Sequence, residues 1–342
     1  MSEGRVGFGI IGLGSISRYH VKGLVEATGC ARVAAVCDTA PGVAERVAAE
    51  TGATAYTDYR ELLKDPAVAA VDLPLPHHLH YEVASRALEA GKHVLIEKPM
   101  APSERECASL IALAKSEGVA ISVAENTPFV QAYVEVERIV RSGTVGRPRL
   151  IRTFIYGSEV DRLNDTKSWK GRAAGTIGGA IFDAGPHSFY LLKWLFGEIE
   201  SVRAFKNKFV EVSEVEDNAV VAGRMKSGAM FTTEYSFTAE IPWGERLEIY
   251  GSEGSLIVDQ LYDPPVIHFH GAKDMRGHPV RSVAFDSTYW KSKSIAAGAA
   301  AFAGAVSRGA PPPVDPLDGQ YSIRVCERAY QSIAADGKEI AI

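Results

Sequence analysis

Three places in the sequence hold residue types that together could take a hydride and a proton from an alcohol. Gly12 and Gly14 stand in a glycine-rich run near the start of the chain, which has the form of a loop that binds the phosphates of a dinucleotide. Lys98 lies just after an apolar run, where a lysine can hold a hydroxyl oxygen. Asp183 and His187 are four residues apart, so on a helix they share a face, and a histidine there can act as a general base. This set of groups makes an enzyme the leading hypothesis.

Each residue of the glycine-rich loop has a physical role in the predicted cofactor site. Gly12 permits the tight turn after the first strand, and Gly14 lets the backbone approach a pyrophosphate. The next helix begins here, so the N–H groups near Ser15 and Ile16 can bind phosphate oxygens. Ser17 stands where such loops often have a third glycine, and it is small enough to let the helix pack closely on the strand. The alternative interpretation is an ordinary strand-to-helix turn.

The second strand is predicted to end at Asp38, and an acidic side chain there distinguishes between the two nicotinamide cofactors. Its carboxylate can accept hydrogen bonds from the ribose hydroxyls of the adenosine half, and it repels the additional phosphate of NADP. The residues that follow at once, 39–41, include no arginine that would bind that phosphate. The sequence therefore favours NAD over NADP. If Asp38 only caps a turn, the preference stays open.

Lys98 and its neighbour Glu97 follow a short apolar strand over residues 93–96. Residues just past the carboxyl end of a parallel strand point into the crevice where ligands bind. A lysine partly shielded from water there can orient a hydroxyl and share its proton, and Glu97 can set the loop geometry or contact the nicotinamide ribose. The alternative interpretation is a surface lysine that happens to precede a proline.

The segment from Gly178 to His187 is the second catalytic candidate. Its glycines permit close backbone approach, and Gly185-Pro186 is typical of a helix start. Asp183 and His187 would then share a face at the helix N-terminus, an end that disfavours an imidazolium while the carboxylate favours one. A histidine under these opposing influences is suited to general-base catalysis. The alternative is that Asp183 caps the helix and His187 belongs to the core.

The alternation of apolar strands and amphipathic helices in the first third of the chain predicts the element order that positions these groups. Short, unbroken apolar strands between helices are the pattern of a parallel sheet covered on both faces. With right-handed crossovers this pattern gives a doubly wound α/β sheet. We therefore expect a dinucleotide-binding Rossmann domain over residues 1–125.

The pattern changes near Asn126. Long strand-like runs follow, with hairpin turns predicted at residues 225–229 and 251–254. These runs indicate an α+β domain with a mostly antiparallel sheet over residues 126–342, which would bind the substrate and mediate oligomerisation. Two C-terminal helices are expected to pack back across the domain junction, near residues 289–308 and 318–336.

Length and composition limit the class of protein. A chain of 342 residues suits two domains, and 46% hydrophobic with 23% charged residues is an ordinary globular composition. The formal net charge of −5 gives no basic surface for nucleic acid or an anionic membrane. The N-terminus shows no signal peptide and no apolar run approaches the roughly 20 residues of a bilayer span, so a cytoplasmic protein is expected. The cysteines are scattered, which favours reduced thiols over a disulfide framework or a zinc site: Cys30, Cys37, Cys107 and Cys326.

Three motifs taken together resemble those of one enzyme family. They are the runs Gly9–Gly14, Gly91–Pro99 and Gly178–His187. In this order and spacing they resemble the glucose–fructose oxidoreductase/inositol dehydrogenase family, often written Gfo/Idh/MocA, and the similarity extends over essentially the whole chain. The resemblance implies an NAD(P)-dependent oxidoreductase that oxidises a secondary hydroxyl of a sugar, cyclitol or glycoside to a ketone.

The resemblance also implies roles for the matching residues. His187 takes the hydroxyl proton while hydride leaves the same carbon for the nicotinamide, Lys98 holds the oxygen, and Asp183 positions the substrate or the neighbouring bases. The chain departs from the family pattern at Tyr190, where relatives often have an aspartate, and at His77, where an amide is usual. Neither change removes the catalytic set.

Position and residue type, and for Pro76, His77 and His80 the family resemblance, predict the rest of the site. Residue 126 follows the last strand of the first domain and should face the cleft, while an aromatic face stacks on a sugar ring and a guanidinium donates to hydroxyls. The predicted cofactor contacts are Gly12, Gly14, Ser15, Ile16, Asp38, Pro76, His77, His80, Glu97, Lys98 and Asn126. The predicted substrate contacts are Lys98, Asn126, Tyr156, Trp169, Arg172, Asp183 and His187, with structural roles as the alternative for Tyr156, Trp169 and Arg172. No metal site is expected, because no carboxylate or cysteine accompanies the pair His268 and His270.

Two other functions stay open at this point. One is a redox-cycling enzyme that retains NAD and oxidises a glycoside transiently, and the other is a regulator that binds the dinucleotide without turnover. The joint presence of Lys98, Asp183 and His187 argues against the regulator. A homodimer or homotetramer is expected, because an antiparallel sheet with one face on helices has its other face solvated or paired, and family members commonly pair it.

Overall fold

The computed structural model describes residues 4–260, 266–271, 281–284 and 290–342. The chain divides into two compact units, Met1–Phe129 with Lys291–Ile323 and Val130–Trp290 with Arg324–Ile342. Lys291–Ile323 therefore belongs to the first unit although it lies near the far end of the chain. The sequence alone did not delimit this stretch.

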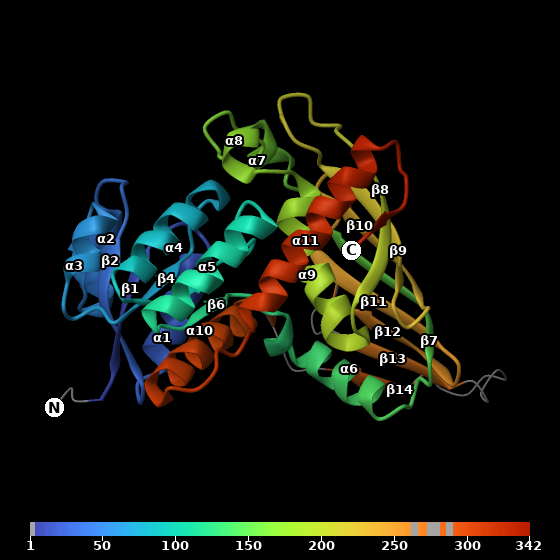
Figure 1. The fold of residues 1–342 in the computed structure, drawn as a ribbon, viewed down its shortest axis with the longest axis horizontal. Helices are drawn as coiled ribbons and strands as arrows, with labels where there is room; N and C mark the ends of the chain where they lie inside the picture. The colour runs from blue at the N-terminus through green and yellow to red at the C-terminus, as the bar shows by residue number, and fades with distance from the viewer. Residues whose placement is uncertain (1–3, 261–265, 272–280, 285–289) are drawn as a thin grey trace. The chain divides into compact units, whose positions relative to one another are not determined.

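The first unit is built on a six-stranded parallel sheet in the order β3-β2-β1-β4-β5-β6 (Figure 1). This is the strand order of a dinucleotide-binding doubly wound sheet, so the predicted architecture is confirmed. The strands are β1 (Val6–Ile11), β2 (Ala31–Cys37), β3 (Thr54–Tyr56), β4 (Ala70–Leu73), β5 (His93–Ile96) and β6 (Ile121–Val123). The helices are α1 (Ser17–Glu26), α2 (Val43–Thr51), α3 (Tyr59–Lys64), α4 (His80–Glu89), α5 (Glu104–Glu117) and α10 (Trp290–Arg308), with short 3-10 turns at His77–Leu79 and Thr127–Phe129.

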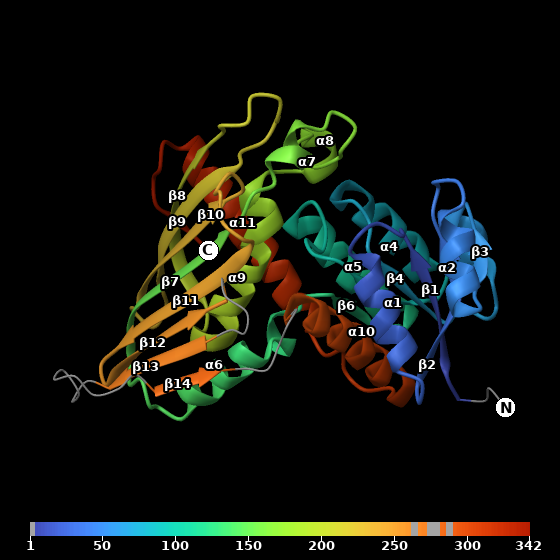
Figure 2. The ribbon, with the colours of Figure 1, turned by 180° about the vertical axis from the view of Figure 1, so that it is seen from behind.

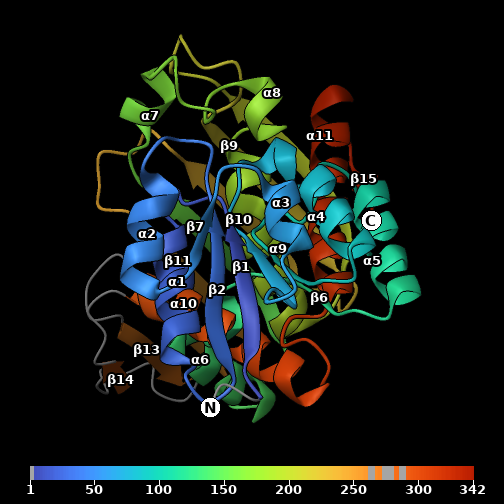
Figure 3. The same cartoon turned by 90° about the vertical axis from the view of Figure 1, so that its left-hand side faces the viewer.

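Helices cover both faces of this sheet, as its nearly continuous apolar strands require. Figure 3 shows α1, α2 and α10 on one side of the strands and α3, α4 and α5 on the other. Phe8 of β1 packs edge-on against Phe302 of α10, with ring centroids 6.2 Å apart, in a core that also holds Leu24 of α1. On the opposite side, Gly9 lies against Leu62 of α3. The sheet thus has an apolar core on each face.

The second unit is built on a nine-stranded sheet in the order β14-β13-β12-β11-β7-β10-β9-β8-β15. Its pairs are antiparallel except β7 with β10, which confirms the predicted mostly antiparallel sheet. The strands are β7 (Pro148–Tyr156), β8 (Ile199–Asn207), β9 (Asn218–Met225), β10 (Met230–Ser236), β11 (Gly244–Gly251), β12 (Gly254–Asp259), β13 (Val266–Gly271), β14 (Arg281–Ala284) and β15 (Ile340–Ala341). The helices are α6 (Gln131–Arg141), α7 (Val160–Asn164), α8 (Ala173–Thr176), α9 (Ala180–Phe196) and α11 (Pro316–Ala334), and the division between the units falls within α11.

Both hairpin turns expected from the sequence are present. Gly228, with a positive φ of 85°, turns the chain between β9 and β10, and the β11–β12 turn spans Ser252 and Glu253. The predicted start of the penultimate helix at Tyr289 lies outside the described residues, and the helix is described from Trp290.

Helix α9 begins earlier than the sequence predicted. Gly185-Pro186 suggested a start, yet the helix begins at Ala180 and Pro186 lies inside it. The reason is tertiary: the buried Glu216 accepts hydrogen bonds from the N–H groups of Ala180, through its carbonyl, and of Ile181, through Oε1. These contacts satisfy the helix start, and burial of the helix outweighs the local preference of proline.

The close approach at this helix start explains the two glycines before it. A Cβ on Gly179 would lie 1.9 Å from the carbonyl oxygen of Glu216, and one on Gly178 would lie 2.3 Å from the hydroxyl of Tyr330. The Tyr330 hydroxyl donates to Glu216 Oε1 at 2.6 Å. Burial, followed by the charge of Glu216, raises the pKa of Tyr330 well above its ordinary value. The phenol therefore stays protonated and keeps donating at physiological pH.

Candidate active site

The glycine loop after β1 contains two glycines that are required for different reasons. Gly12 has φ of +95°, and a Cβ there would lie 2.9 Å from the carbonyl oxygen of Pro74. The protein itself therefore excludes a side chain at Gly12. Gly14 is exposed, and nothing lies within 4 Å of the place where its Cβ would be. Nothing in the described structure requires a glycine there, which is the expected situation if a bound pyrophosphate occupies that side.

The loop is fixed by its own hydrogen bonds. The hydroxyl of the buried Ser17 donates to the carbonyl of Gly14 at 2.7 Å, and the Ser17 N–H donates to the same oxygen at 3.1 Å. Helix α1 starts at Ser17 without a side-chain cap. The N–H groups of Ser15 and Ile16, just before the helix, are thus placed as a phosphate site requires.

Asp38 follows β2 and lies against the same loop. Its Oδ2 accepts a hydrogen bond from the N–H of Leu13 at 2.7 Å, and its Oδ1 accepts from the N–H of Ala40 at 2.8 Å. The capping role considered for Asp38 is therefore present. Its negative charge is also held at the position that disfavours the phosphate of NADP.

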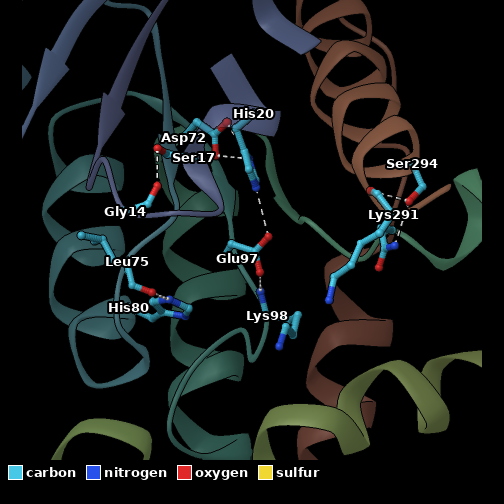
Figure 4. A network of polar contacts seen from close by, with 11 residues as sticks. Gly14, Ser17, His20, Asp72, Leu75, His80, Glu97, Lys98, Lys291 and Ser294 are labelled. Atoms are coloured by element: carbon cyan, nitrogen blue, oxygen red, sulfur yellow. Dashed lines mark hydrogen bonds and ion pairs between the residues drawn. The ribbon is translucent and has the colours of Figure 1, made fainter. Parts of the chain in front are cut away.

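A buried cluster of charged groups lies beneath the ends of β4 and β5 (Figure 4). His20 of α1 places its Nδ1 2.9 Å from Asp72 Oδ2 and its Nε2 3.0 Å from Glu97 Oε1. His20 and Asp72 are wholly buried, and Glu97 is 7% exposed. Because a carboxylate oxygen only accepts, both ring nitrogens carry protons and the ring is an imidazolium.

The pKa of His20 reflects these contacts. Burial by itself lowers the pKa of His20, but the charge of Asp72 and the hydrogen bonds and charge of both carboxylates raise it from 6.5 to about 10. His20 is therefore charged at physiological pH. This buried histidine was not singled out from the sequence, and its place on the buried face of the helix after the glycine loop was the available signal.

The Lys98 loop is held by hydrogen bonds on both sides. The N–H of Lys98 donates to Glu97 Oε2 at 3.0 Å. The imidazole of His80 lies 2.6 Å from the carbonyl of Pro99 through Nδ1 and 2.9 Å from that of Leu75 through Nε2. Burial is the main cause that lowers the pKa of His80, so the neutral ring donates to one carbonyl, and we assign the shorter contact, to Pro99. His80 thus joins the loop after β4 to the loop after β5.

Three other predicted cofactor contacts lie in the same unit. Pro76 precedes the 3-10 turn that contains His77, and the buried ring of His77 packs edge-on against that of His80, with centroids 5.8 Å apart. Asn126 donates through Nδ2 to the hydroxyl of Ser294 near the start of α10, at 2.9 Å. Its amide therefore joins the segment after β6 to α10, a contact that the sequence did not suggest.

Asp183 and His187 lie on α9 in the second unit. From Ala180 to Leu192 every residue of this helix is buried except His187. Asp183 Oδ2 accepts a hydrogen bond from Nζ of Lys170 at 2.9 Å, and the same ammonium lies 3.7 Å from Glu159. His187 is the eighth residue of α9, so the predicted effect of the helix N-terminus on it was wrong, because that effect falls off within the first turn.

Lys170 is a candidate that the sequence prediction missed. It lies beside Trp169, which was named, and its ammonium also stands 5.9 Å from the centre of the Phe237 ring. The available signal was weak, because Lys170 is one of three basic residues in the loop that precedes the glycine motif, with Lys167 and Arg172. Its partner on a helix thirteen residues further on is fixed only by tertiary structure.

The structure assigns structural contacts to two of the predicted substrate residues. Arg172 donates to Glu214 at 3.0 Å and braces the loop before α8. Tyr156 donates to Glu234 at 2.6 Å. Strand β7 alternates, and Tyr156 falls on the face opposite to the buried residues that face α9, so it does not accompany Asp183 and His187. Trp169 is partly buried just before Gly171 and stays a prediction.

No group of three or more metal-ligating side chains occurs among the residues that the structure describes. In the same part of the chain, no helix is long and apolar enough to cross a membrane. All four cysteines are free thiols, and three of them are buried.

The residues of the first unit fit a dinucleotide. The loop is shaped by Gly12 and Ser17, the side of Gly14 is open, the N-terminus of α1 lacks a side-chain cap, and a carboxylate stands at the end of β2. With strand order 3-2-1-4-5-6, these features define an NAD-binding Rossmann protein.

Comparison with known proteins identifies the family. A model described as an oxidoreductase family with an NAD-binding Rossmann fold matches residues 6–125, and a model of the GFO/IDH/MocA C-terminal domain matches residues 133–257. The chain therefore belongs to the Gfo/Idh/MocA family of NAD-binding oxidoreductases, and it is an enzyme of that class.

Curated relatives agree with this assignment, and a solved structure shares the fold. The chain is 30% identical to scyllo-inositol 2-dehydrogenase (NAD(+)) of Bacillus subtilis, over 76% of this chain and 75% of that protein. It is 28% identical to myo-inositol 2-dehydrogenase of Thermotoga maritima, over 76% and 77% of the two chains. The fold is similar to that of levoglucosan dehydrogenase in complex with NADH and levoglucosan, with a TM-score of 0.87, 23% identity and 99% of each chain covered.

The two loop glycines make a matched pair for a test of cofactor binding. We expect Gly14→Ala to change the free energy of unfolding by less than about 0.5 kcal/mol but to weaken NAD binding at least about tenfold, because its methyl group faces the cofactor side. Gly12→Ala should instead lower the free energy of unfolding by about 1–3 kcal/mol, because of its positive φ and the contact with Pro74. Urea unfolding and calorimetric titration with NAD measure both effects. Unchanged NAD affinity in Gly14→Ala would contradict the assignment of the loop.

The His20 cluster predicts how stability depends on pH. Because the pKa of His20 is raised in the folded state, its contribution to stability is complete below pH 6.5 and is lost as the pH rises toward about 10. Between these limits the free energy of unfolding of the wild type should fall by up to about 1.4 kcal/mol per pH unit relative to that of His20→Gln. Urea unfolding of both proteins at several pH values measures this difference. Parallel curves would show that His20 is not an imidazolium in the folded protein.

Proposed function

We propose that the chain is an NAD-dependent dehydrogenase that oxidises a secondary hydroxyl of a sugar or cyclitol to a ketone. The observation that carries the proposal is the exposure pattern of α9. In a helix that is otherwise buried from Ala180 to Leu192, the side chain of His187 alone is partly open, one turn after an ion-paired Asp183. A core histidine would be covered like its neighbours, whereas an acid–base group must reach its substrate.

The proposed roles follow from the match of Lys98, Asp183 and His187 to the family's motif residues, together with the contact of Asp183. Bound NAD supplies the acceptor for the hydride that leaves the hydroxyl-bearing carbon. His187 takes the proton of the hydroxyl group, and the Lys98 ammonium donates a hydrogen bond to its oxygen and stabilises the negative charge that develops there. Asp183, held by Lys170, keeps a negative charge one helical turn from His187, which stabilises the imidazolium once it forms.

The substrate class rests on the relatives and on residue type. Two relatives are named as inositol 2-dehydrogenases, and a protein of similar fold is named for levoglucosan. Trp169 offers an aromatic face of the kind that packs on a sugar ring. Asp38 supports NAD over NADP, because its carboxylate is held at the end of β2 by the N–H groups of Leu13 and Ala40.

The decisive test follows NADH formation. Wild-type protein with NAD should reduce it in the presence of one class among inositols, aldoses and glycosides, measured by absorbance or fluorescence. His187→Ala and Lys98→Ala should each lower kcat by at least about a hundredfold while NAD still binds, because both groups act on the reacting hydroxyl. A polyol product without accumulation of NADH would instead identify the redox-cycling enzyme. NAD binding with no product from any polyol would contradict the dehydrogenase.

The same family relationship supports pairing of the open face of the second sheet. Figure 2 shows this face of the strands without helices over it. Phe205, Val220 and Met230 project from the neighbouring strands β8, β9 and β10 and are 64%, 43% and 55% exposed. Phe205 and Val220 are register partners and form an apolar patch. Met230 lies on the same face, opposite Arg224. We propose that a second copy of this chain covers the patch.

The assembly can be tested with one charged substitution and one control. Wild-type protein should have the mass of a dimer or tetramer in analytical ultracentrifugation. Phe205→Glu should shift it toward the monomer by at least about tenfold in dissociation constant, because a buried charge disfavours pairing. Leu317→Glu, at a similarly exposed apolar position on α11, should leave the mass unchanged. A monomeric wild type would contradict the proposal.

A further inference from the structure

His20 is the point where three elements of the first unit meet. The residue lies on α1, Asp72 lies within β4, and Glu97 directly follows β5. Its two ring nitrogens are 2.9 Å and 3.0 Å from oxygens of the two carboxylates, and all three side chains are buried (Figure 4). No other residue type reaches two opposed carboxylates with a rigid ring that is also a cation at both ends.

The carboxylate of Glu97 links His20 to the backbone of the next residue, Lys98. One of its oxygens, Oε1, accepts from His20, and the other, Oε2, accepts from the N–H of Lys98 at 3.0 Å. The carboxylate therefore has one orientation in which both contacts are made. A change at His20 moves the group that holds the backbone of Lys98, even though His20 itself does not touch the lysine side chain.

We propose that His20 is a positioning residue for the reaction: its imidazolium, held between Asp72 and Glu97, orients the Glu97 carboxylate and thereby fixes the backbone from which Lys98 projects. This inference rests on the proposed function, in which Lys98 binds the hydroxyl oxygen.

The charge of the ring is as necessary as its shape. The charged and titratable groups that face it are Asp72 from β4 and Glu97 from the loop after β5, with Lys98 beyond Glu97. Without the cation, two carboxylates would share one buried site and repel each other. This repulsion would turn the Glu97 carboxylate away from Asp72, and its hydrogen bond to the N–H of Lys98 would be lost. The raised pKa of His20 agrees with this picture.

Helix α1 gives His20 a second connection. The same helix starts at Ser17, whose hydroxyl holds Gly14 in the phosphate loop. His20 therefore lies one helical turn from the phosphate loop, and only the Glu97 carboxylate separates it from the backbone of Lys98. The phosphate loop follows β1 and the Lys98 loop follows β5. In this proposal the His20 cluster fixes the spacing between these two loops.

The experiment compares His20→Gln with a substitution at another histidine of the first unit, His93 of β5. In His20→Gln one amide replaces the cation, so we expect amide hydrogen exchange at Lys98, followed by NMR, to accelerate by at least about tenfold without global unfolding. With the substrate identified by the turnover assay, kcat should fall by about tenfold or more while the dissociation constant of NAD changes less than about threefold. The control is His93→Gln at the start of β5, where the ring of His93 accepts through Nδ1 from the N–H of Ala120 and touches neither carboxylate of the cluster in the described residues; it should change none of these quantities.

The outcomes separate this inference from the proposed function. Faster exchange at Lys98 in a protein that oxidises no polyol would support the positioning role and reject the dehydrogenase. Unchanged exchange at Lys98, or faster exchange with an unchanged kcat, would overturn the positioning role whatever the substrate.

A second variant guards against loss of folding. If His20→Gln does not fold, Asp72→Asn added to it removes the carboxylate left without a cation, and the double variant should fold. Glu97 is still without its cation in that protein, so exchange at Lys98 should remain fast and kcat low. Recovery of both to wild-type values would show that His20 only balances the charge of Asp72, and would overturn the inference.

Discussion

The buried carboxylates of Asp72 and Glu97 impose the strictest requirement on the first unit, because both are in contact with the one cation of His20. Burial of a carboxylate without a partner greatly lowers the free energy of unfolding. If one member of such a cluster is removed, the remaining charges become unpaired and destabilise the fold in the same way. The three groups come from α1, β4 and the end of β5, so the cluster is satisfied only when these elements have their native spacing. The sheet and helices around it supply the dry environment that makes the requirement strict.

The second unit uses a related device at α9. Glu216 is buried and accepts hydrogen bonds from N–H groups at the start of α9 and from the hydroxyl of Tyr330. Its carboxylate also lies 3.5 Å from the ammonium of Lys206. In each unit a buried carboxylate thus fixes the start of the segment that carries a proposed catalytic group. A side chain that is already fixed loses little freedom when the reaction begins, which is the general advantage of a preorganised site.

The first sheet and its loops followed from the sequence because the signals there are local. Unbroken apolar strands, the turn at Gly12 and the residue after each strand are read from neighbouring positions alone. The contacts of His20 and Lys170 were not predictable in the same way, since their partners are 52 and 13 residues away in the chain. At helix α9 a clear local signal gave a wrong prediction. Pro186 suggested that the helix starts there, but hydrogen bonds to Glu216 and burial of the helix place the start at Ala180.

The hydrogen bonds of the glycine loop have a consequence for the thermodynamics of cofactor recognition. Ser17 and Asp38 hold the loop through its backbone, at Gly14 O and at Leu13 N, with no group of a ligand taking part. The loop is therefore already ordered when a dinucleotide arrives, and association does not have to include the entropy loss of folding a disordered segment. Its contribution to the heat capacity of binding should therefore come from the removal of water from a rigid surface. No contribution from folding of the loop is expected.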